Sequence, residues 1–587
     1  MKLFFYHYLS TIQMTIMKKL GIFLSLAILS LTSMRAQTLF TLAPDYQSPQ
    51  REVRAMWLTT LQGLDWPYKA ARTPAETEVQ KQTLCQILDQ LQAAGINTVL
   101  FQTRIRSTTS YPSAIEPWDA VYTDTPGKAP LYDPLQFALD ECHKRQMELH
   151  AWVVAFPICK TNVQKALGRK SLPSLHPELC QRCGDQWMMD PGVPGTADYI
   201  AGICEEIVKN YQVDGIHLDY IRYPEQGIPF NDNRTYRKYG KGKNKAEWRR
   251  ENVTRVVQKI HDAVKGVRPW VKISCSPVGK HADLRQQSSY GWNARNAVYQ
   301  DAQAWLRDGL MDILFPMMYF DGKHFYPFAA DWQDNAHGRW IVPGLGIYFL
   351  HERQKDWDLD IIRRQMFFSR QIGAAGQAQF RSKFFTDNVK GLYDFAAGDF
   401  YREKVRTPAM TWEDSIAPTG PAAQIEVQRH NLYLHWRAAR DNAPATPVTY
   451  NVYYCPNDSL DVRQSELLAY GIQDTTYVLT PALPARLRGY YAVTASDAYG
   501  NESSGKAVSA YTQIAATIAS SGEDNILAIP EVEGAEFLLV TDITERHVFT
   551  TPYASKIDVS RLAPGYYEVR TLSKKGKSHR VLRFWKE

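Results

Sequence analysis

The sequence predicts an α/β fold, a (β/α)8 TIM barrel, followed by a β-sandwich and a small C-terminal β domain. Eight strand-like segments alternate with helical segments up to residue 412, an alternation typical of a parallel sheet. No GxGxxG or P-loop pattern follows any of these strands, and a count of eight favours a closed barrel over an open, doubly wound sheet. After residue 412 the helical patterns stop.

Each expected barrel element is a short apolar segment or an amphipathic one, bounded by turn residues. The strands are expected at residues 51–59, 97–104, 148–156, 213–224, 272–277, 311–320, 340–348 and 377–385. The helices are expected at residues 75–94, 134–146, 196–210, 247–264, 296–308 and 358–372. Gly95 directly follows the first helix, where a glycine commonly ends one.

The fourth strand carries the most informative pattern. Alternation sends Ile216 and Leu218 to one face and His217 and Asp219 to the other. A parallel strand is normally apolar on both faces, so an imidazole and a carboxylate there are costly unless they have a role. Chemistry in a TIM barrel sits at the carboxyl ends of the strands, and Asp219 is close to that end.

The remaining chain divides by composition. Residues 418–421 form a Pro/Gly linker, and alternating runs follow at residues 423–427, 431–436, 449–454, 475–479 and 489–496. We expect a signal peptide at residues 1–36, the barrel at 37–412, a sandwich at 413–512 and a β-rich domain at 513–587. The role of the last domain is open.

The N-terminus predicts export. Lys18 and Lys19 precede the apolar run 20–31, and small residues before Gln37 suit signal-peptide cleavage. The run is too short to span a bilayer, so we expect a periplasmic, extracellular or cell-surface protein without stable membrane insertion. The net charge of +7 is small for 587 residues and excludes a nucleic-acid-binding signature.

The eight cysteines are too few for a disulfide scaffold in an exported chain of this size. Cys180 and Cys183 form a lone CxxC, which with Cys159 and His176 could hold zinc; a local disulfide or free thiols are the alternatives. No HExxH or equivalent spacing indicates a catalytic metal, and we expect no cofactor.

The barrel region resembles the glycosyl-hydrolase-like family 10. The motifs that carry the resemblance are RAMW (54–57), LDWP (64–67), YPSAIEPW (111–118), HAW (150–152), DPG (190–192), DGIHLDYIRYP (214–224), MMY (317–319) and PGLGIY (343–348). The resemblance implies a TIM-barrel hydrolase that acts on glycans, and one branch of the family cleaves peptidoglycan strands lacking stem peptides. Many relatives have an aspartate where Thr108 stands, which puts one substrate contact in doubt. The run 490–502, with Trp436, resembles a fibronectin type III domain.

Glycosidic cleavage needs one protonated and one ionised carboxyl group. Asp219, beside Arg222, is expected to be the ionised group; the alternative is a structural Asp219–Arg222 pair. Glu116, next to Pro117, is the first choice of proton donor because apolar neighbours raise a carboxyl pKa, and Asp65 is the second. A surface or capping role is the alternative for both. Sequence gives no distance between carboxylates, so retention and inversion are not separated.

Aromatic, histidine and arginine side chains near the expected strand ends are candidates for binding sugar rings and hydroxyls; for the aromatics and histidines the alternative is a place in the barrel core. The substrate-binding candidates are Arg104, Trp57, His150, Trp152, His217, Arg222, Tyr223 and Tyr319. The 12% aromatic content agrees with either a sugar-binding protein or a large core.

Three functional hypotheses follow. The first is an exported glycoside hydrolase whose substrate partner is a poly- or oligosaccharide. The second is a glycan-binding or adhesion protein on the same barrel, without hydrolysis. The third is a metal-dependent deacetylase, which would require zinc. Neither the linkage, the endo or exo mode nor the oligomeric state follows from the sequence.

Overall fold

The structure is a computed structural model that describes residues 49–428, 431–443, 446–479, 490–509, 519–520, 525–542, 544, 546–573 and 578–586. The chain divides into two compact units, Met1–Pro49 and Gln50–Glu587, and the features described below belong to the second. The predicted signal peptide lies outside the described residues. Within the described ranges, every helix is too short or too polar to cross a membrane.

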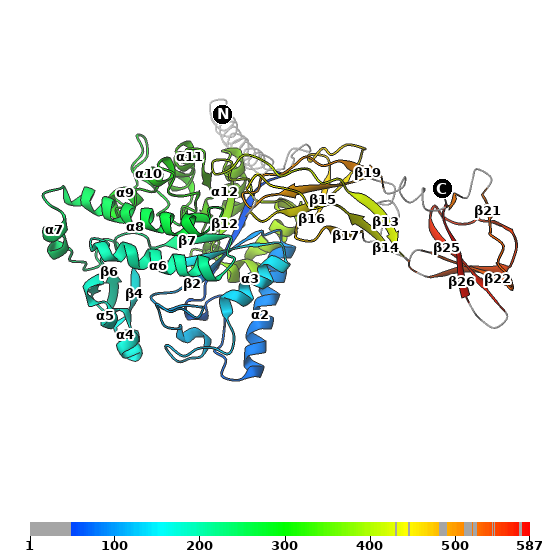
Figure 1. The fold of residues 1–587 in the computed structure, drawn as a ribbon. Helices are drawn as coiled ribbons and strands as arrows, with labels where there is room; N and C mark the ends of the chain where they lie inside the picture. Colours follow the sequence, from blue (N-terminus) through cyan, green and yellow to red (C-terminus); the bar gives the residue numbers. More distant parts are fainter. Residues whose placement is uncertain are drawn as a thin grey trace, which may run out of the picture. The chain divides into compact units, whose positions relative to one another are not determined.

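A closed parallel barrel forms the first part of the second unit (Figure 1). Its strands, in spatial order, are β10 (Trp340–Ile341), β9 (Ile313–Leu314), β8 (Lys272–Cys275), β7 (Gly215–Asp219), β3 (Glu148–Val154), β2 (Thr98–Arg104), β1 (Val53–Leu58), β12 (Gly376–Gln379) and β11 (Gly344–Leu345). Only Val342 and Pro343 separate β10 from β11, so the two ends of the sheet are one interrupted strand. Eight strands therefore close into the expected barrel.

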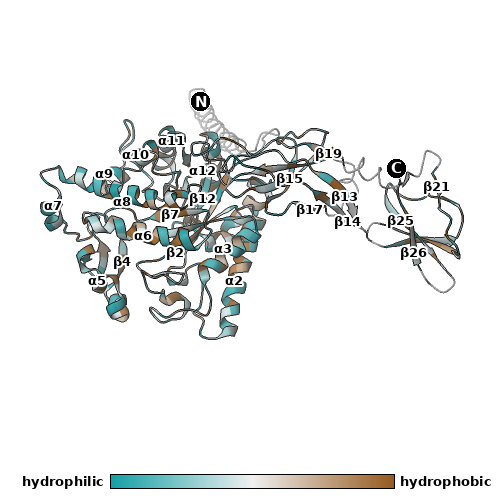
Figure 2. Cartoon of the chain, viewed as in Figure 1, coloured by the Kyte–Doolittle hydropathy of each residue, from teal (hydrophilic) through white to brown (hydrophobic). Residues whose placement is uncertain are grey.

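Helices surround the barrel in the expected alternation. The main ones are α2 (Pro74–Ala93), α3 (Pro134–Lys144), α6 (Pro194–Asn210), α8 (Lys245–Val267) and α12 (Leu359–Gln371), with α6 and α8 side by side outside β7 (Figure 1). A capping box begins α2: Thr73 Oγ1 accepts from the Glu76 backbone N–H, and the Glu76 carboxylate accepts from the Thr73 N–H. Apolar residues concentrate on strands such as β2 and β7, and hydrophilic residues on the helices (Figure 2).

Besides the interrupted seventh strand, three further barrel elements differ from expectation. The sixth strand shrinks to β9 because Pro316 has no N–H for the ladder, although Met317 pairs again with its neighbours. The helix expected at 296–308 is split into α9 (Ala294–Ala297) and α10 (Ala302–Arg307) because Tyr299 has a φ of +58°. The eighth strand stops at Gln379, and α13 (Ser382–Thr386) follows because the Asp65 carboxylate accepts the Lys383 N–H and draws the chain out of the sheet.

Small, mostly antiparallel sheets follow the barrel. One sheet joins β13 (Gln424–Gln428), β14 (Asn431–His435) and β17 (Thr476–Leu479); a second joins β16 (Glu466–Ile472), β15 (Thr449–Cys455), β18 (Tyr490–Ser496) and β19 (Ala507–Ser509). Further along, β22 (Phe537–Asp542), β23 (His547–Pro552), β25 (Gly565–Leu572) and β26 (Ser578–Lys586) share a sheet with β20 (Ala519–Ser520), and β21 (Ile526–Ala528) pairs with β24 (Lys556–Asp558). The fibronectin type III assignment and the domain boundaries stay predictions. β16 was not predicted; Gly471 and register shifts interrupt its alternation.

We expect Gly344→Ala to destabilise the barrel by about 1–3 kcal/mol, because overpacking forces neighbouring atoms to move. A Cβ at Gly344 would lie 2.7 Å from the Trp57 ring and 3.0 Å from the Pro316 carbonyl oxygen. Denaturant unfolding followed by tryptophan fluorescence measures the change. Gly266→Ala, in α8, is the matched control, because a Cβ added at Gly266 would meet no neighbouring atom within 4 Å. This substitution should stabilise the helix by roughly 0.5–1 kcal/mol. Equal shifts for both variants would contradict this packing argument.

Candidate active site

Asp219 is the last residue of β7 and lies at the carboxyl end of the barrel strands. Its side chain is 7% exposed and accepts three hydrogen bonds. Oδ1 accepts from the Tyr220 backbone N–H at 2.8 Å and from Ser276 Oγ at 3.0 Å, and Oδ2 accepts from Trp152 Nε1 at 3.2 Å. Three neighbouring strands therefore hold this carboxylate in one orientation at the barrel mouth.

The surroundings of Asp219 shift its pKa in opposite directions. Burial raises the pKa of Asp219, while the positive charge of Arg222 and the three donors lower it. Arg222 bonds to Glu225 rather than to Asp219, at 2.8 Å, and its guanidinium lies 4.6 Å from the Tyr220 ring centre. The structural Asp219–Arg222 pair that the sequence left open is thus replaced by an Arg222–Glu225 pair. Glu225 itself is half-exposed.

Tyr319 shares this environment. Its ring is half-buried, stacks on Phe380 at 5.3 Å and meets Tyr348 edge-on at 5.7 Å. Burial and the nearby Asp219 charge raise the pKa of Tyr319 well above its usual value, and burial and the same charge raise that of Tyr220. Both phenols keep their protons at neutral pH and are hydrogen-bond donors beside Asp219.

Glu116 and Arg104 form a buried ion pair rather than a catalytic acid and a substrate contact. Glu116 accepts from Arg104 Nε at 2.7 Å and Nη2 at 2.6 Å, and from the Tyr199 hydroxyl at 3.1 Å. Arg104 also donates to the Val154 and Ala155 carbonyls. The Arg104 side chain is fully buried and that of Glu116 is 1% exposed, so neither presents a free polar atom to a ligand.

Asp65 has a structural partner as well. Its side chain is fully buried, accepts the backbone N–H groups of Thr59 and Lys383, and pairs with Arg381. Burial raises the pKa of Asp65, and Arg381 opposes this. Because both carboxylate oxygens are occupied and sealed from solvent, Asp65 joins the loops after β1 and β12 and has no access to a substrate.

A layer inside the barrel contains Trp57 and His217. Trp57 Nε1 donates to His217 Nε2 at 3.1 Å, and His217 Nδ1 lies 3.0 Å from Ser274 Oγ. Burial lowers the pKa of His217 well below its usual value, so the ring is neutral, donates from Nδ1 to Ser274 and accepts from Trp57 at Nε2. Phe315 closes the layer 5.2 Å from the imidazole. Trp57 and His217 therefore belong to the barrel core, and they contact each other and their neighbours in place of the sugar expected from the sequence.

Of the remaining substrate-binding candidates, two are buried away from Asp219 and one contacts it. His150 is 1% exposed, stands near the start of β3 and bonds to Glu148, so it lies away from the mouth. Tyr223 is 2% exposed and accepts from Asn252 at 3.2 Å, in the packing beneath α8. Trp152 remains at the site through its bond to Asp219, although it is 4% exposed.

The cysteine cluster does not assemble. Cys180 and Cys183 lie on β5 (Cys180–Cys183), Cys159 lies on β4 (Pro157–Lys160), and β6 (Gln186–Met189) runs between them. All three are free thiols. In the described part of the chain, no group of three His, Cys, Asp or Glu side chains is placed to hold a metal ion.

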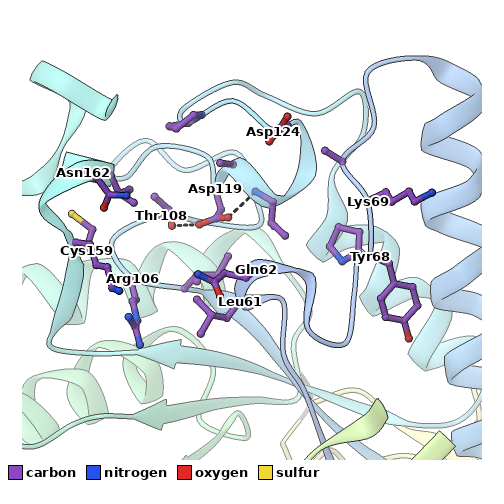
Figure 3. Close-up of a pocket in the computed structure, with 18 residues that line it drawn as sticks. Leu61, Gln62, Tyr68, Lys69, Arg106, Thr108, Asp119, Asp124, Cys159 and Asn162 are labelled. Atoms are coloured by element: carbon purple, nitrogen blue, oxygen red, sulfur yellow. Dashed lines mark hydrogen bonds between the residues drawn. The ribbon is translucent and has the colours of Figure 1, made fainter. Parts of the chain in front are cut away.

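A pocket of about 530 Å³ between the loops after β1, β2 and β3 was not foreseen from the sequence (Figure 3). Asp119 lies at its centre, where Oδ2 accepts from Thr108 Oγ1 at 2.6 Å and Oδ1 accepts from the Val121 N–H at 2.8 Å. Thr108 occupies the position where the family resemblance expects an aspartate. The Asp119 carboxylate, eleven residues later in the chain, lies against Thr108 and so places a carboxylate next to this position. In the sequence, only the unusual Thr108 pointed to this pocket.

We expect Glu116→Gln to destabilise the barrel by about 3–5 kcal/mol, because it leaves Arg104 charged and unpaired in the interior. Glu178→Gln, at a mostly exposed carboxylate, is the matched control and should leave the unfolding free energy unchanged. Denaturant unfolding measures both. Turnover per folded molecule should be unchanged in Glu116→Gln. Loss of turnover in a fully folded variant would show that Glu116 takes part in catalysis.

Comparison with known proteins identifies the family of the chain. The model of the family "Glycosyl hydrolase-like 10" matches residues 52–341. The chain is 31% identical to glycosyl hydrolase YngK of Bacillus subtilis (strain 168), over 77% of this chain and 92% of that protein. It is 36% identical to glycosyl hydrolase DigH of Escherichia coli (strain K12), over 47% of this chain and 67% of that protein. An alpha-L-fucosidase isoenzyme 2 from Paenibacillus thiaminolyticus aligns at 14% identity and a TM-score of 0.40, over 60% of this chain and 49% of that one, a likeness too slight to bear on activity. With its closed barrel, its matching motifs and a relative aligned over nearly its whole length, the chain belongs to the glycosyl hydrolase-like 10 family.

Proposed function

We propose that the chain is an exported glycoside hydrolase that cleaves O-glycosidic bonds of a poly- or oligosaccharide, with peptidoglycan glycan strands as the first substrate to test. Family membership supports the reaction class. The basic and apolar N-terminal pattern, with Lys18 and Lys19, supports export. The observation that carries the proposal is the Asp219 carboxylate, held by three donors at the mouth of the barrel.

Asp219 acts in its ionised form, as nucleophile or as the base that activates water. Its donors suit this role, because hydrogen bonds from Trp152 and Ser276 stabilise the charge and fix the oxygens in place. The protonated phenols of Tyr220 and Tyr319 bind sugar oxygens beside it. Glu116 and Asp65 are not retained as proton donors, because their oxygens are occupied by arginines and backbone N–H groups. The leaving oxygen then takes its proton from solvent water, which enters at the open barrel mouth.

A glycan-binding protein without hydrolysis is the second candidate. The ion pairs of Glu116 and Asp65 favour it, since they remove two of the three carboxyl groups expected to perform catalysis. Release of new reducing ends separates the two functions, because a binding protein retains the glycan without cutting it.

We expect Asp219→Asn to lower the rate of reducing-end release by about 10²- to 10⁴-fold, the usual contribution of a positioned carboxylate. The assay is a digest of a glycan panel that includes peptidoglycan strands freed of stem peptides. Asp214→Asn is the matched control at the other end of the same strand, where the carboxylate accepts from the Leu149 N–H and contacts His143. Equal activity of Asp219→Asn and wild type would remove Asp219 from the mechanism. A wild type that binds glycans and releases no ends would establish the second candidate.

The pH dependence of turnover reports the Asp219 environment. Burial raises its pKa, so the ionised, active form is lost at a higher pH than for an exposed aspartate, whose pKa is about 3.9. Arg222→Gln removes the charge that lowers this pKa, so the acidic limb of the profile should move to higher pH. Arg222→Lys keeps the charge and should leave the limb near its wild-type position. Identical profiles for Arg222→Gln and wild type would show that Asp219 does not set the acidic limb.

A further inference from the structure

The pocket that contains Asp119 combines apolar walls with polar side chains that have no intramolecular task. Leu61, Ile105 and Val121 contribute apolar surface. Gln62 and Asn162 are exposed and make no side-chain hydrogen bond within the described residues. Figure 3 shows Arg106 on the side of Cys159 and Asn162, and Tyr68 and Lys69 on the opposite side. Sugar rings present CH faces and hydroxyls together, which this mixture of apolar and polar groups suits.

The charges of the pocket do not balance. Lys69, Arg106 and Lys160 line it, and in the part of the chain that the structure describes none of them has a salt bridge. Of the acidic lining residues, Asp124 is already paired with Arg72 at 2.6 Å. Asp119 remains, half-buried, with its oxygens bonded to Thr108 and a backbone N–H and with a pKa raised by burial. The pocket therefore carries an excess of positive charge that a ligand anion can neutralise.

Arg106 connects the pocket to the mouth of the barrel. Its positive charge lowers the pKa of Tyr220, the residue directly after Asp219, so its guanidinium is within electrostatic reach of that phenol. Arg106 follows β2 by two residues, and β2 and β7 both pair with β3. A chain of sugars cut at Asp219 can thus extend toward Arg106 over the ends of adjacent strands.

We propose that this pocket is a subsite for a sugar residue that bears a carboxylate, in which Arg106 and Lys160 bind the carboxylate and Asp119 binds ring hydroxyls. The subsite rests on the proposed function, because it serves a glycan whose neighbouring bond lies at Asp219. It makes the enzyme selective for acidic glycans over neutral ones of the same length.

The test uses the full-length chain with Asp219→Asn, so that binding is measured without cleavage. The probes are peptidoglycan glycan strands freed of stem peptides, in which every second sugar carries a carboxylate, and the same strands after chemical reduction of that carboxylate to an alcohol. Calorimetry gives the dissociation constants. Arg106→Gln with Lys160→Gln is the test variant, and Lys165→Gln, an exposed lysine in the following helix α4 (Thr161–Leu167), is the control.

The acidic strands should bind at least about tenfold more tightly than the reduced ones, as expected when charge-assisted hydrogen bonds are lost. The test variant should remove this difference by weakening only the acidic strands, and the control should retain it. Equal affinity of the two probes, no binding of either, or equal weakening of both by the test variant overturns the subsite. A wild type that never cuts these strands while Asp219→Asn still prefers the acidic ones would overturn the proposed hydrolysis and leave the subsite standing.

Discussion

A charge inside the barrel is tolerated only where another group compensates it, and this constraint decides which polar residues are left for function. Removing a carboxylate or guanidinium from water costs on the order of several kcal/mol per group. The Arg104–Glu116 pair and the Asp65–Arg381 pair offset that cost by ion pairing, and His217 avoids it by remaining neutral. Their bonding capacity is used up in holding strands and loops together.

Asp219 meets the same constraint differently. Its compensating groups are neutral donors and an arginine that bonds elsewhere, so the carboxylate is oriented without being neutralised by a direct ion pair. The parallel sheet explains why this occurs at the mouth: strand ends from residues 58 to 379 meet at one edge when the barrel closes. The pocket around Asp119 lies at this edge too, with its positive charge still uncompensated.

The regular part of the fold was predictable because period and length are local properties. Strands β1, β2, β3 and β7 and the long helices lie close to their expected positions. The exceptions have local causes that a pattern of apolar residues does not register. Pro316 and Pro343 interrupt strands by lacking an N–H, and Tyr299 breaks a helix with a positive φ. The eighth strand ends early for a non-local reason, because the Lys383 N–H donates to Asp65, which is more than 300 residues away in the chain.

The sequence by itself determined the barrel and the place of Asp219 at a strand end, because alternation and strand order require no knowledge of distant partners. Only the tertiary structure decided that Glu116, Arg104 and Asp65 are structural and that Thr108 brings Asp119 into a pocket. The physical reason is that a side chain's availability depends on what surrounds it. Burial and hydrogen-bond partners come from segments that are far apart in the chain and adjacent only after folding.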